Sequence, residues 1–393
     1  MNYFGNKSQC CGCGACAHIC PKRCIIMKPD SEGFLYPEVN MDICVSCGRC
    51  GKVCPINFYN EEHTVKKVYA VKNRDESIRS TSSSGGTFFE LASEIIDEGG
   101  VVFGCVMNKE FVAEHIAVYD IEELEPIKSS KYVQSDLKDT YKQAKKLLEN
   151  GKKVLYSGTP CQIAGLRNYL NKEYENLFLV DVLCHGVPSP KVLKEYLELL
   201  EKKYGSKIVS INFRSKEEGW KRLYIDVRFE NGQRYFTFCG YDQYLSMFLN
   251  NMSLRPSCYD CKFTTLHRQG DITLGDFWGI GKRYPECDDD KGVSLVITNT
   301  DKGNRLFENI ENKLTYIDSN IDLATAGQRT LSAPTIKNPL RDGFYEMYEE
   351  NGLEAALNEF VKIPSKPVQV YYAVMNWGLK WLRKIYGMVV GKI

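Results

Sequence analysis

Residues 10–21 read CCGCGACAHICP, and residues 44–55 read CVSCGRCGKVCP. In both segments four cysteines follow the spacing C-x2-C-x2-C-x3-C, and a proline comes directly after the fourth cysteine. The second segment repeats the first 34 residues further along the chain, which indicates an internal duplication. This repeat decides the fold of the N-terminal part of the protein.

The spacing allows three thiolates of one run to bind three corners of a 4Fe-4S cubane, while the fourth thiolate reaches the other cluster. The ligand sets are therefore expected to cross, with Cys10, Cys13, Cys16 and Cys54 on one cluster and Cys20, Cys44, Cys47 and Cys50 on the other. Zinc is the alternative, but zinc sites usually pair two separated C-x2-C knuckles. Cys11 and Cys24 stand outside the spacing and are interpreted as small buried hydrophobic residues.

The composition excludes several other classes of protein. A chain of 393 residues with 43% hydrophobic residues can bury the cores of two or three domains. The net charge of +1 gives no indication of nucleic-acid binding. The first residues, MNYFGNKSQCCGC, lack the apolar core of a signal peptide, so the 17 cysteines are expected in a reducing cytoplasm.

Beyond the repeat, the pattern predicts an α/β core followed by a more antiparallel region. Apolar runs typical of buried strands alternate with helical patterns, of which Thr87–Asp97 and Leu137–Glu149 are the clearest. From Ile208 to Phe238 the pattern changes to a hairpin with Asn231-Gly232 at its turn.

The fold class expected is therefore a multidomain α/β and α+β protein. Its parts are a bacterial-type two-cluster ferredoxin domain at residues 1–58, two parts of one core at 68–190 and 191–350, and a basic tail at 362–393.

Four later cysteines occur in unusual contexts. Cys161 and Cys184 follow apolar strand-like runs, where α/β folds collect site residues, and Cys258 and Cys261 form a C-x2-C pair. A third 4Fe-4S site, a redox-active pair and ordinary packing all remain open on spacing alone. Packing is the interpretation for the remaining three cysteines, Cys105, Cys239 and Cys287.

Two segments resemble anion-binding turns, Ser82–Gly86 before a predicted helix and Gly158–Pro160 before QIAGLRNYL. Helix N-termini offer free N–H groups to phosphate, but an ordinary serine cap with a glycine turn explains the same residues. His185 could shuttle a proton or serve as a structural histidine.

Several ordered motifs resemble the beta-subunit family of coenzyme F420 hydrogenases and dehydrogenases over about residues 68–348. They are SSSGG at 82–86, SKYVQS at 130–135, SGTPCQIAGLR at 157–167, CHGVPSP at 184–190, and CYDCKF with GDITLGDFWGIG at 258–281. The resemblance implies a flavoprotein that holds FAD beside a 4Fe-4S cluster.

It also implies roles for individual residues. Cys161, Cys184, Cys258 and Cys261 would hold a third cluster, and the FAD neighbourhood would include Ser84, Gly85, Gly86, Lys131 and Tyr132. Lys131 could stabilise negative charge on reduced flavin.

The expected function is an FAD and iron-sulfur reductase or dehydrogenase that passes electrons between a hydride carrier or small organic substrate and iron-sulfur partners. The alternative is an electron-transfer subunit without flavin chemistry that relays electrons to a partner enzyme. Residues 362–393 contain six Lys/Arg and no Asp/Glu, so a basic amphipathic helix could dock on protein or lie peripherally on the cytoplasmic face of a membrane.

Overall fold

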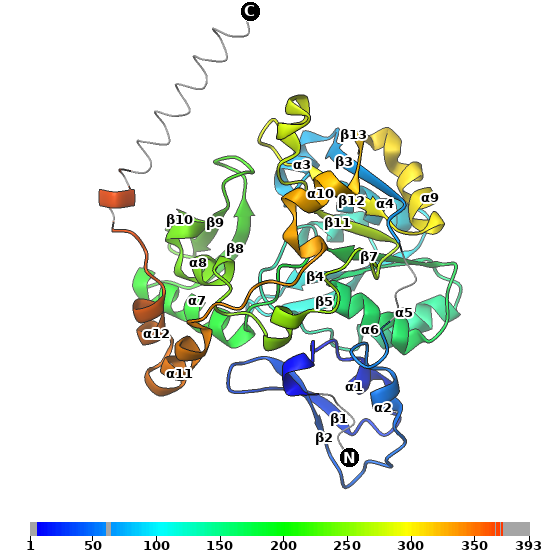
Figure 1. Cartoon of the computed structure of the whole chain (residues 1–393), viewed down its shortest axis with the longest axis horizontal. Coiled ribbons are helices and arrows are strands. Elements are labelled where there is room, and N and C mark those ends of the chain that lie inside the picture. Colours follow the sequence, from blue (N-terminus) through cyan, green and yellow to red (C-terminus); the bar gives the residue numbers. More distant parts are fainter. Residues whose placement is uncertain (1–5, 60–63, 366, 370, 372–393) are drawn as a thin grey trace, which may run out of the picture.

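The computed structural model describes residues 6–59, 64–365, 367–369 and 371. Figure 1 shows an N-terminal domain, in blue, below a large sheet that carries helices on both faces. A second, smaller sheet with its own helices, mostly green and orange, lies beside the large one. Most of the predicted basic tail lies outside the described residues. Among the helices that are described, none has the length and apolar character needed to cross a membrane.

The N-terminal domain reflects the duplication in its sequence. Helices α1 (Ala15–Ile19) and α2 (Arg49–Lys52) each begin after a glycine in the left-handed conformation, and these glycines are Gly14 (φ 70°) and Gly48 (φ 72°). Residues with a Cβ rarely adopt this conformation, so glycine permits the turn inside each cysteine run. Between the helices, β1 (Ile25–Pro29) pairs antiparallel with β2 (Leu35–Val39).

The large sheet has eight strands in the order β13-β3-β12-β11-β7-β6-β4-β5. Strands β4, β6, β7 and β11 are parallel, and β3 runs in the same direction because it is antiparallel to β12, which is antiparallel to β11. The strands are β3 (Lys67–Asn73), β4 (Val101–Met107), β5 (Ala113–Val118), β6 (Val154–Gly158), β7 (Leu177–Val182), β11 (Ile272–Asp276), β12 (Ser294–Thr298) and β13 (Leu314–Ser319).

Alternation of side chains along the strands explains why both faces of this sheet are buried. In β3, Tyr69 and Val71 pack on the face covered by helices α4 and α9, whereas Val68 and Ala70 pack on the opposite face. The predicted α/β core is therefore confirmed. The surrounding helices are α3 (Glu76–Thr81), α4 (Thr87–Asp97), α5 (Thr140–Glu149), α6 (Pro160–Leu170), α9 (Asp301–Ile310) and α10 (Ile321–Gly327).

The second sheet is antiparallel, with the order β10-β9-β8, and packs on four helices in a separate hydrophobic core. Its hairpin turns at Asn231-Gly232 as predicted, with Gly232 at φ +81°. After this sheet the chain returns to complete the large one with β11–β13. Its elements are α7 (Pro190–Tyr204), β8 (Ile208–Ser215), β9 (Tyr224–Phe229), β10 (Arg234–Phe238), α8 (Gln243–Leu249), α11 (Arg341–Asn351) and α12 (Leu353–Phe360).

The fully buried side chain of Arg255 fastens the N-terminal domain to the core. Its Nε donates to the carbonyl of Cys10 at 2.7 Å, and one Nη donates to the carbonyl of Leu35 at 3.0 Å. The other Nη donates to Oε1 of Gln134 at 3.3 Å, and the guanidinium lies 4.0 Å from the ring centre of Tyr36. The Arg255 side chain thus holds both the first cysteine run, at Cys10, and the β1–β2 pair, at Leu35.

Replacing Arg255 by Met should loosen this attachment. The carbonyls of Cys10 and Leu35 and the amide of Gln134 would lose a buried donor, at a cost of about 1–3 kcal/mol for each group left unsatisfied. An anaerobic thermal melt followed by circular dichroism should show a Tm lower by several degrees. Lys28→Met is the control, because Lys28 forms only an exposed ion pair with Glu38. Equal melting of the two variants would contradict the role of Arg255.

Candidate functional site

The parallel direction of β3, β4, β6, β7 and β11 brings their carboxyl ends to one edge of the large sheet. Ser82–Gly86 follows β3, and Lys131 follows the β4–β5 pair. Cys161 and Cys184 follow β6 and β7, and Asp276 ends β11. Segments that are far apart in the sequence therefore share the edge where ligands usually bind in such sheets.

The four cysteines Cys20, Cys44, Cys47 and Cys50, called here the outer tetrad, line one cavity of about 20 Å³ in the N-terminal domain. Cys24 lines it too, with its Sγ 3.3 Å from the Sγ of Cys20. The cavity thus brings a cysteine of the first run together with three of the second. This arrangement fits the crossed ligand set that the spacing predicts.

The inner tetrad consists of Cys10, Cys13, Cys16 and Cys54 and lies toward the core. Burial raises the pKa of Cys16 to about 12, and the neighbouring thiols of Cys10 and Cys54 add to this rise. Helix α6 approaches Cys13 so closely that a Cβ at Gly165 would lie 2.9 Å from the Sγ of Cys13. Glycine at this position lets the cysteine run pack directly against the large sheet's helical layer.

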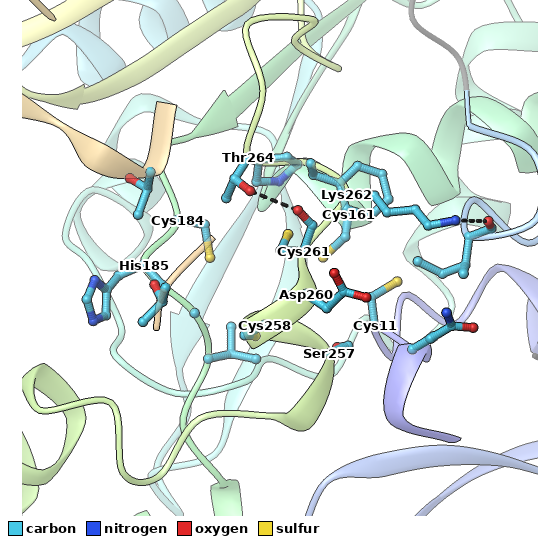
Figure 2. Close-up of a pocket in the computed structure, with 18 of the residues that line it drawn as sticks. Cys11, Cys161, Cys184, His185, Ser257, Cys258, Asp260, Cys261, Lys262 and Thr264 are labelled. Carbon is cyan, nitrogen blue, oxygen red and sulfur yellow. Dashed lines mark hydrogen bonds between the residues drawn. The ribbon is translucent and has the colours of Figure 1, made fainter. Parts of the chain in front are cut away.

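A second cavity, of about 40 Å³ and here called the core cavity, lies where the N-terminal domain meets the sheet edge. Five cysteines line it, and Figure 2 shows them coming from separate segments of the chain. They are Cys11, Cys161, Cys184, Cys258 and Cys261. Four of them are the cysteines that the resemblance assigns to a third cluster, and the fifth comes from the ferredoxin domain.

A buried ion pair holds the loop that carries Cys258 and Cys261. Arg268 donates to Oδ1 of Asp181 on β7 at 2.9 Å, and both side chains are almost fully buried. Burial raises the pKa of Cys258 to about 12 and that of Cys261 to about 11. Metal binding must therefore displace protons from these thiols, as it does whenever cysteine becomes a thiolate ligand.

The segment Ser82–Gly86 is held by its own hydrogen bonds. The hydroxyl of Ser84 donates to the carbonyl of Val293 at 2.8 Å, and that of Ser83 accepts from the backbone of Ser130. Gly85 packs so tightly that a Cβ there would lie 2.2 Å from the carbonyl oxygen of Val71. These serines and Gly85 therefore shape the turn, and the free donors of this region are the backbone N–H groups that begin α4.

Beside that helix start, the hydroxyl of Thr87 is buried and has no hydrogen-bond partner among the described residues. A buried polar atom without a partner is costly, so it marks a place where a polar group can bind. The turn at Gly158–Pro160 differs, because the backbone N–H of Thr159 already donates to Oε1 of Gln162 at 2.9 Å. That observation favours the ordinary capping interpretation for the second segment.

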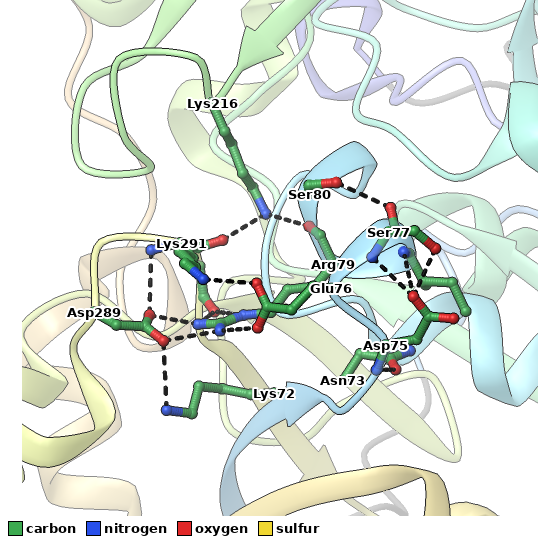
Figure 3. A network of polar contacts seen from close by, with 12 residues as sticks. Lys72, Asn73, Asp75, Glu76, Ser77, Arg79, Ser80, Lys216, Asp289 and Lys291 are labelled. Atoms are coloured by element: carbon green, nitrogen blue, oxygen red, sulfur yellow. Dashed lines mark hydrogen bonds and ion pairs between the residues drawn. The ribbon is translucent and has the colours of Figure 1, made fainter.

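Cations surround Ser82–Gly86. Arg214 donates to the carbonyl of Ser83 at 3.0 Å and forms an ion pair with Asp276, and Lys216 donates to the carbonyl of Ser84. Burial lowers the pKa of Lys216 to about 7, and the nearby Arg214 charge acts in the same direction. Figure 3 shows the ammonium of Lys216 donating to the carbonyl of Arg79, whose guanidinium pairs with Asp289. These contacts hold the loop before Gly292 next to Ser82–Gly86.

Lys131 and Tyr132 lie in the same region. The ammonium of Lys131 donates to the backbone carbonyls of Pro126 and Ser129, and burial lowers its pKa to about 8. The hydroxyl of Tyr132 accepts from Arg214 at 2.9 Å. A partly neutral lysine and a buried guanidinium thus lie near the start of α4.

Two parts of the chain, residues 151–322 and residues 9–58, match models of known protein families. Residues 151–322 match the family model for the C-terminal part of the beta subunit of coenzyme F420 hydrogenase/dehydrogenase. Residues 151–322 belong to this beta-subunit family. Residues 9–58 match the model of a 4Fe-4S dicluster domain. The chain is thus an iron-sulfur oxidoreductase of the beta-subunit type with a fused dicluster domain.

No curated protein matches the chain. Among solved structures, one similar chain belongs to the xenon-derivatised F420-reducing NiFe hydrogenase complex from Methanosarcina barkeri. It is 16% identical, with a TM-score of 0.46, over 76% of this chain and 92% of that one.

The structure also places His185 and the three cysteines that were interpreted as packing residues. His185 hydrogen-bonds Oδ1 of Asn251 at 2.6 Å, and its ring turns away from the thiols in Figure 2, which favours a structural role. Cys239 and Cys287 are buried in hydrophobic cores, as the packing interpretation expects. Cys105 is partly buried, packs against the core of the second sheet and lies near Lys131.

Sequence reasoning missed Cys11, which it treated as a small buried hydrophobic residue. The Cys11 thiol lies near the thiols of both Cys13 and Cys161, and its pKa is raised well above its usual value, mainly by Cys13. It therefore bridges the inner tetrad and the core cavity. The signal in the sequence is the adjacent pair Cys10-Cys11. Neighbouring side chains of an extended segment point in opposite directions, so when Cys10 faces the inner tetrad, Cys11 faces another site.

Replacing Cys20 by Ser should remove the cluster of the outer tetrad, because the crossed ligand set places Cys20 with the second run. About four irons, one cubane, should be lost, and the spectrum of the inner cluster should remain. Iron analysis and electron paramagnetic resonance of the anaerobic protein measure both. Cys24→Ser is the matched control, since Cys24 lies beside Cys20 but outside the spacing, and it should retain its iron. Selective loss of the inner cluster in Cys20→Ser would contradict the crossed assignment.

Proposed function

We propose that this protein is an FAD-dependent iron-sulfur reductase or dehydrogenase. It passes electrons between a hydride carrier or small organic substrate and a redox partner, through FAD and three 4Fe-4S clusters. The observation that carries the proposal is the core cavity, because its thiols join the candidate flavin edge of the sheet to the dicluster domain.

The donor set of the core cavity suits a cubane. A 4Fe-4S cluster takes four thiolates, and Cys161, Cys184, Cys258 and Cys261 all lie within the segment that matches the beta-subunit family. Cys11 then remains a thiol next to Cys161, where it can donate a hydrogen bond to a ligand sulfur. Such hydrogen bonds tune the potential of a cluster.

The residues at the start of α4 suit the phosphate and ring of a flavin. The free N–H groups of the first turn and the hydroxyl of Thr87 supply donors, and Lys131 and Arg214 supply positive charge. Ser84, Gly85 and Gly86 would form the turn that presents these donors, and Tyr132 would hold Arg214 in place through its hydroxyl.

The chemistry requires both kinds of cofactor. When bound, FAD exchanges a hydride as a two-electron unit, whereas a cubane carries one electron at a time. The positions of the cysteines set the order in which electrons would pass from one site to the next. The core cavity contacts the inner tetrad through Cys11, and the outer tetrad reaches the surface at the exposed Cys47.

Iron and flavin analysis of the anaerobically purified protein tests the proposal. We expect about twelve irons, from three cubanes, and one FAD. Cys258→Ser should lose about four irons, whereas Cys11→Ser should keep all of them because Cys11 is not a ligand. Cys239→Ser, at a buried cysteine outside every cavity described above, is the control. Reduction by a panel of F420H2, NADH, NADPH and reduced ferredoxin, followed by flavin bleaching, identifies the donor.

About eight irons without flavin would reject the proposal and leave the electron-transfer subunit as the function. If Cys258→Ser kept all of its iron while Cys11→Ser lost about four irons, from one cubane, then Cys11 rather than Cys258 would be the fourth ligand of the core cluster.

Lys131 should make the potential of the flavin depend on pH. With its pKa lowered to about 8 by burial, Lys131 is a cation below that pH and neutral above it. A nearby cation favours the negatively charged reduced flavin, so the wild-type potential should exceed that of Lys131→Met below about pH 8 and approach it above. Lys131→Arg should keep the higher potential at alkaline pH, because arginine stays protonated. Spectroscopic titrations from pH 6 to 10 measure this, and equal potentials at pH 6 would contradict the role.

A further inference from the structure

The loop between β2 and α2 exposes large apolar side chains beside the outer tetrad. Three of these side chains lie within five residues of one another, and their exposed fractions are 62% for Met41, 49% for Ile43 and 57% for Val45. Grouped apolar residues that face solvent usually mark an interaction surface. The loop leads directly into the second cysteine run.

Exposed cations also occur in or directly after the two cysteine segments that supply the outer tetrad. Three of the four carboxylates in residues 6–59 are already paired, since Asp30 binds Lys7, Glu38 binds Lys28 and Glu32 binds Arg341. The remaining carboxylate is Asp42. Within the described part of the chain, no carboxylate forms an ion pair with any of four exposed cations, namely Lys22, Arg23, Arg49 and Lys52.

Two of these cations lie at the outer tetrad itself. Lys22, Val45 and Arg49 line the outer cavity and are also exposed, and Cys47 is an exposed cysteine of the tetrad. A molecule placed over Val45 would therefore come close to the outer cluster while facing a rim of cations. The inner tetrad offers no such access, because α1 packs against α5 and α6.

We infer that this face docks an acidic electron-carrier protein, such as a ferredoxin or flavodoxin with a negative rim around its cofactor. The docking face consists of Met41, Ile43 and Val45 with the cations Lys22, Arg23, Arg49 and Lys52. One electron leaves the reduced carrier and enters the outer cubane, or moves in the opposite direction, and no bond forms. The inference rests on the proposed assignment of the outer cluster to Cys20, Cys44, Cys47 and Cys50.

Charge complementarity favours such a carrier over other occupants. Redox encounters bury small surfaces and rely on electrostatic steering to raise the association rate, which suits a small apolar loop with a charged rim. A permanent partner would require a larger apolar area than one loop provides.

Stopped-flow mixing of the full-length oxidised protein with reduced plant-type 2Fe-2S ferredoxin, an acidic carrier, tests the inference. The second-order rate constant should fall as ionic strength rises. The double variant Lys22→Glu/Arg49→Glu should react at least about tenfold more slowly at low salt, and the difference should shrink at high salt. The matched control is Lys202→Glu/Lys203→Glu, at exposed lysines in the last turn of α7, outside the N-terminal domain. It carries the same change in charge and should react like the wild type.

Iron content and the extent of reduction by dithionite separate failure of docking from failure of the cluster assignment. If a variant keeps its iron and dithionite reduction, a slower reaction with ferredoxin supports docking at this face. An equal slowing in the control, a rate without salt dependence, or a faster reaction with cationic cytochrome c in its reduced form would overturn the inference. The inference would also be overturned if the double variant lost binding to phosphatidylglycerol vesicles but reacted with ferredoxin at the wild-type rate. The face would then bind a membrane instead of a carrier protein.

Discussion

The arrangement of the sites depends on the buried guanidinium of Arg255. It binds the carbonyl of Cys10 on one side and stands three residues before Cys258 on the other. No carboxylate among the described residues pairs with it, although a buried cation normally requires one. Burial raises the pKa of Cys258, and the charge of Arg255 opposes that rise. Arg255 therefore places a buried positive charge between the first cysteine run and the segment that carries Cys258.

The direction of the strands supplies the second constraint. Ser82–Gly86, Cys161 and Cys184 are separated by long stretches of sequence, yet each follows a strand whose carboxyl end reaches the same edge. Lys131 joins them through its neighbour Ser130, whose backbone N–H donates to the hydroxyl of Ser83. The return of the chain to the sheet through β11 adds Asp276, which pairs with Arg214 beside the candidate flavin turn. A site with hydride chemistry at one side and cluster chemistry at the other can thus form without any long active-site insertion.

The three groups of cysteines differ in their access to solvent. The outer tetrad includes the exposed Cys47, the inner tetrad includes the buried Cys13, and Cys161 and Cys258 of the core cavity are partly buried. Low dielectric disfavours charge, and the cations Arg255 and Arg268 oppose the rise that burial causes in the pKa of Cys258 and Cys261. The N-terminal domain therefore contributes the most exposed cysteine of the three groups.

The sequence by itself determined the dicluster domain, because the spacing of Cys10–Cys20 and Cys44–Cys54 is a local property that only a few metal sites satisfy. It also determined the α/β core, since the apolar runs of the strands and the helical patterns between them are local too. Only the tertiary structure decided that Cys11 belongs with Cys161 and that Arg255 holds the two parts together. Both depend on contacts between segments more than 100 residues apart, which no local pattern encodes. The hydrogen bond between His185 and Asn251 likewise joins separate segments, so the tertiary structure alone shows the partner of this histidine.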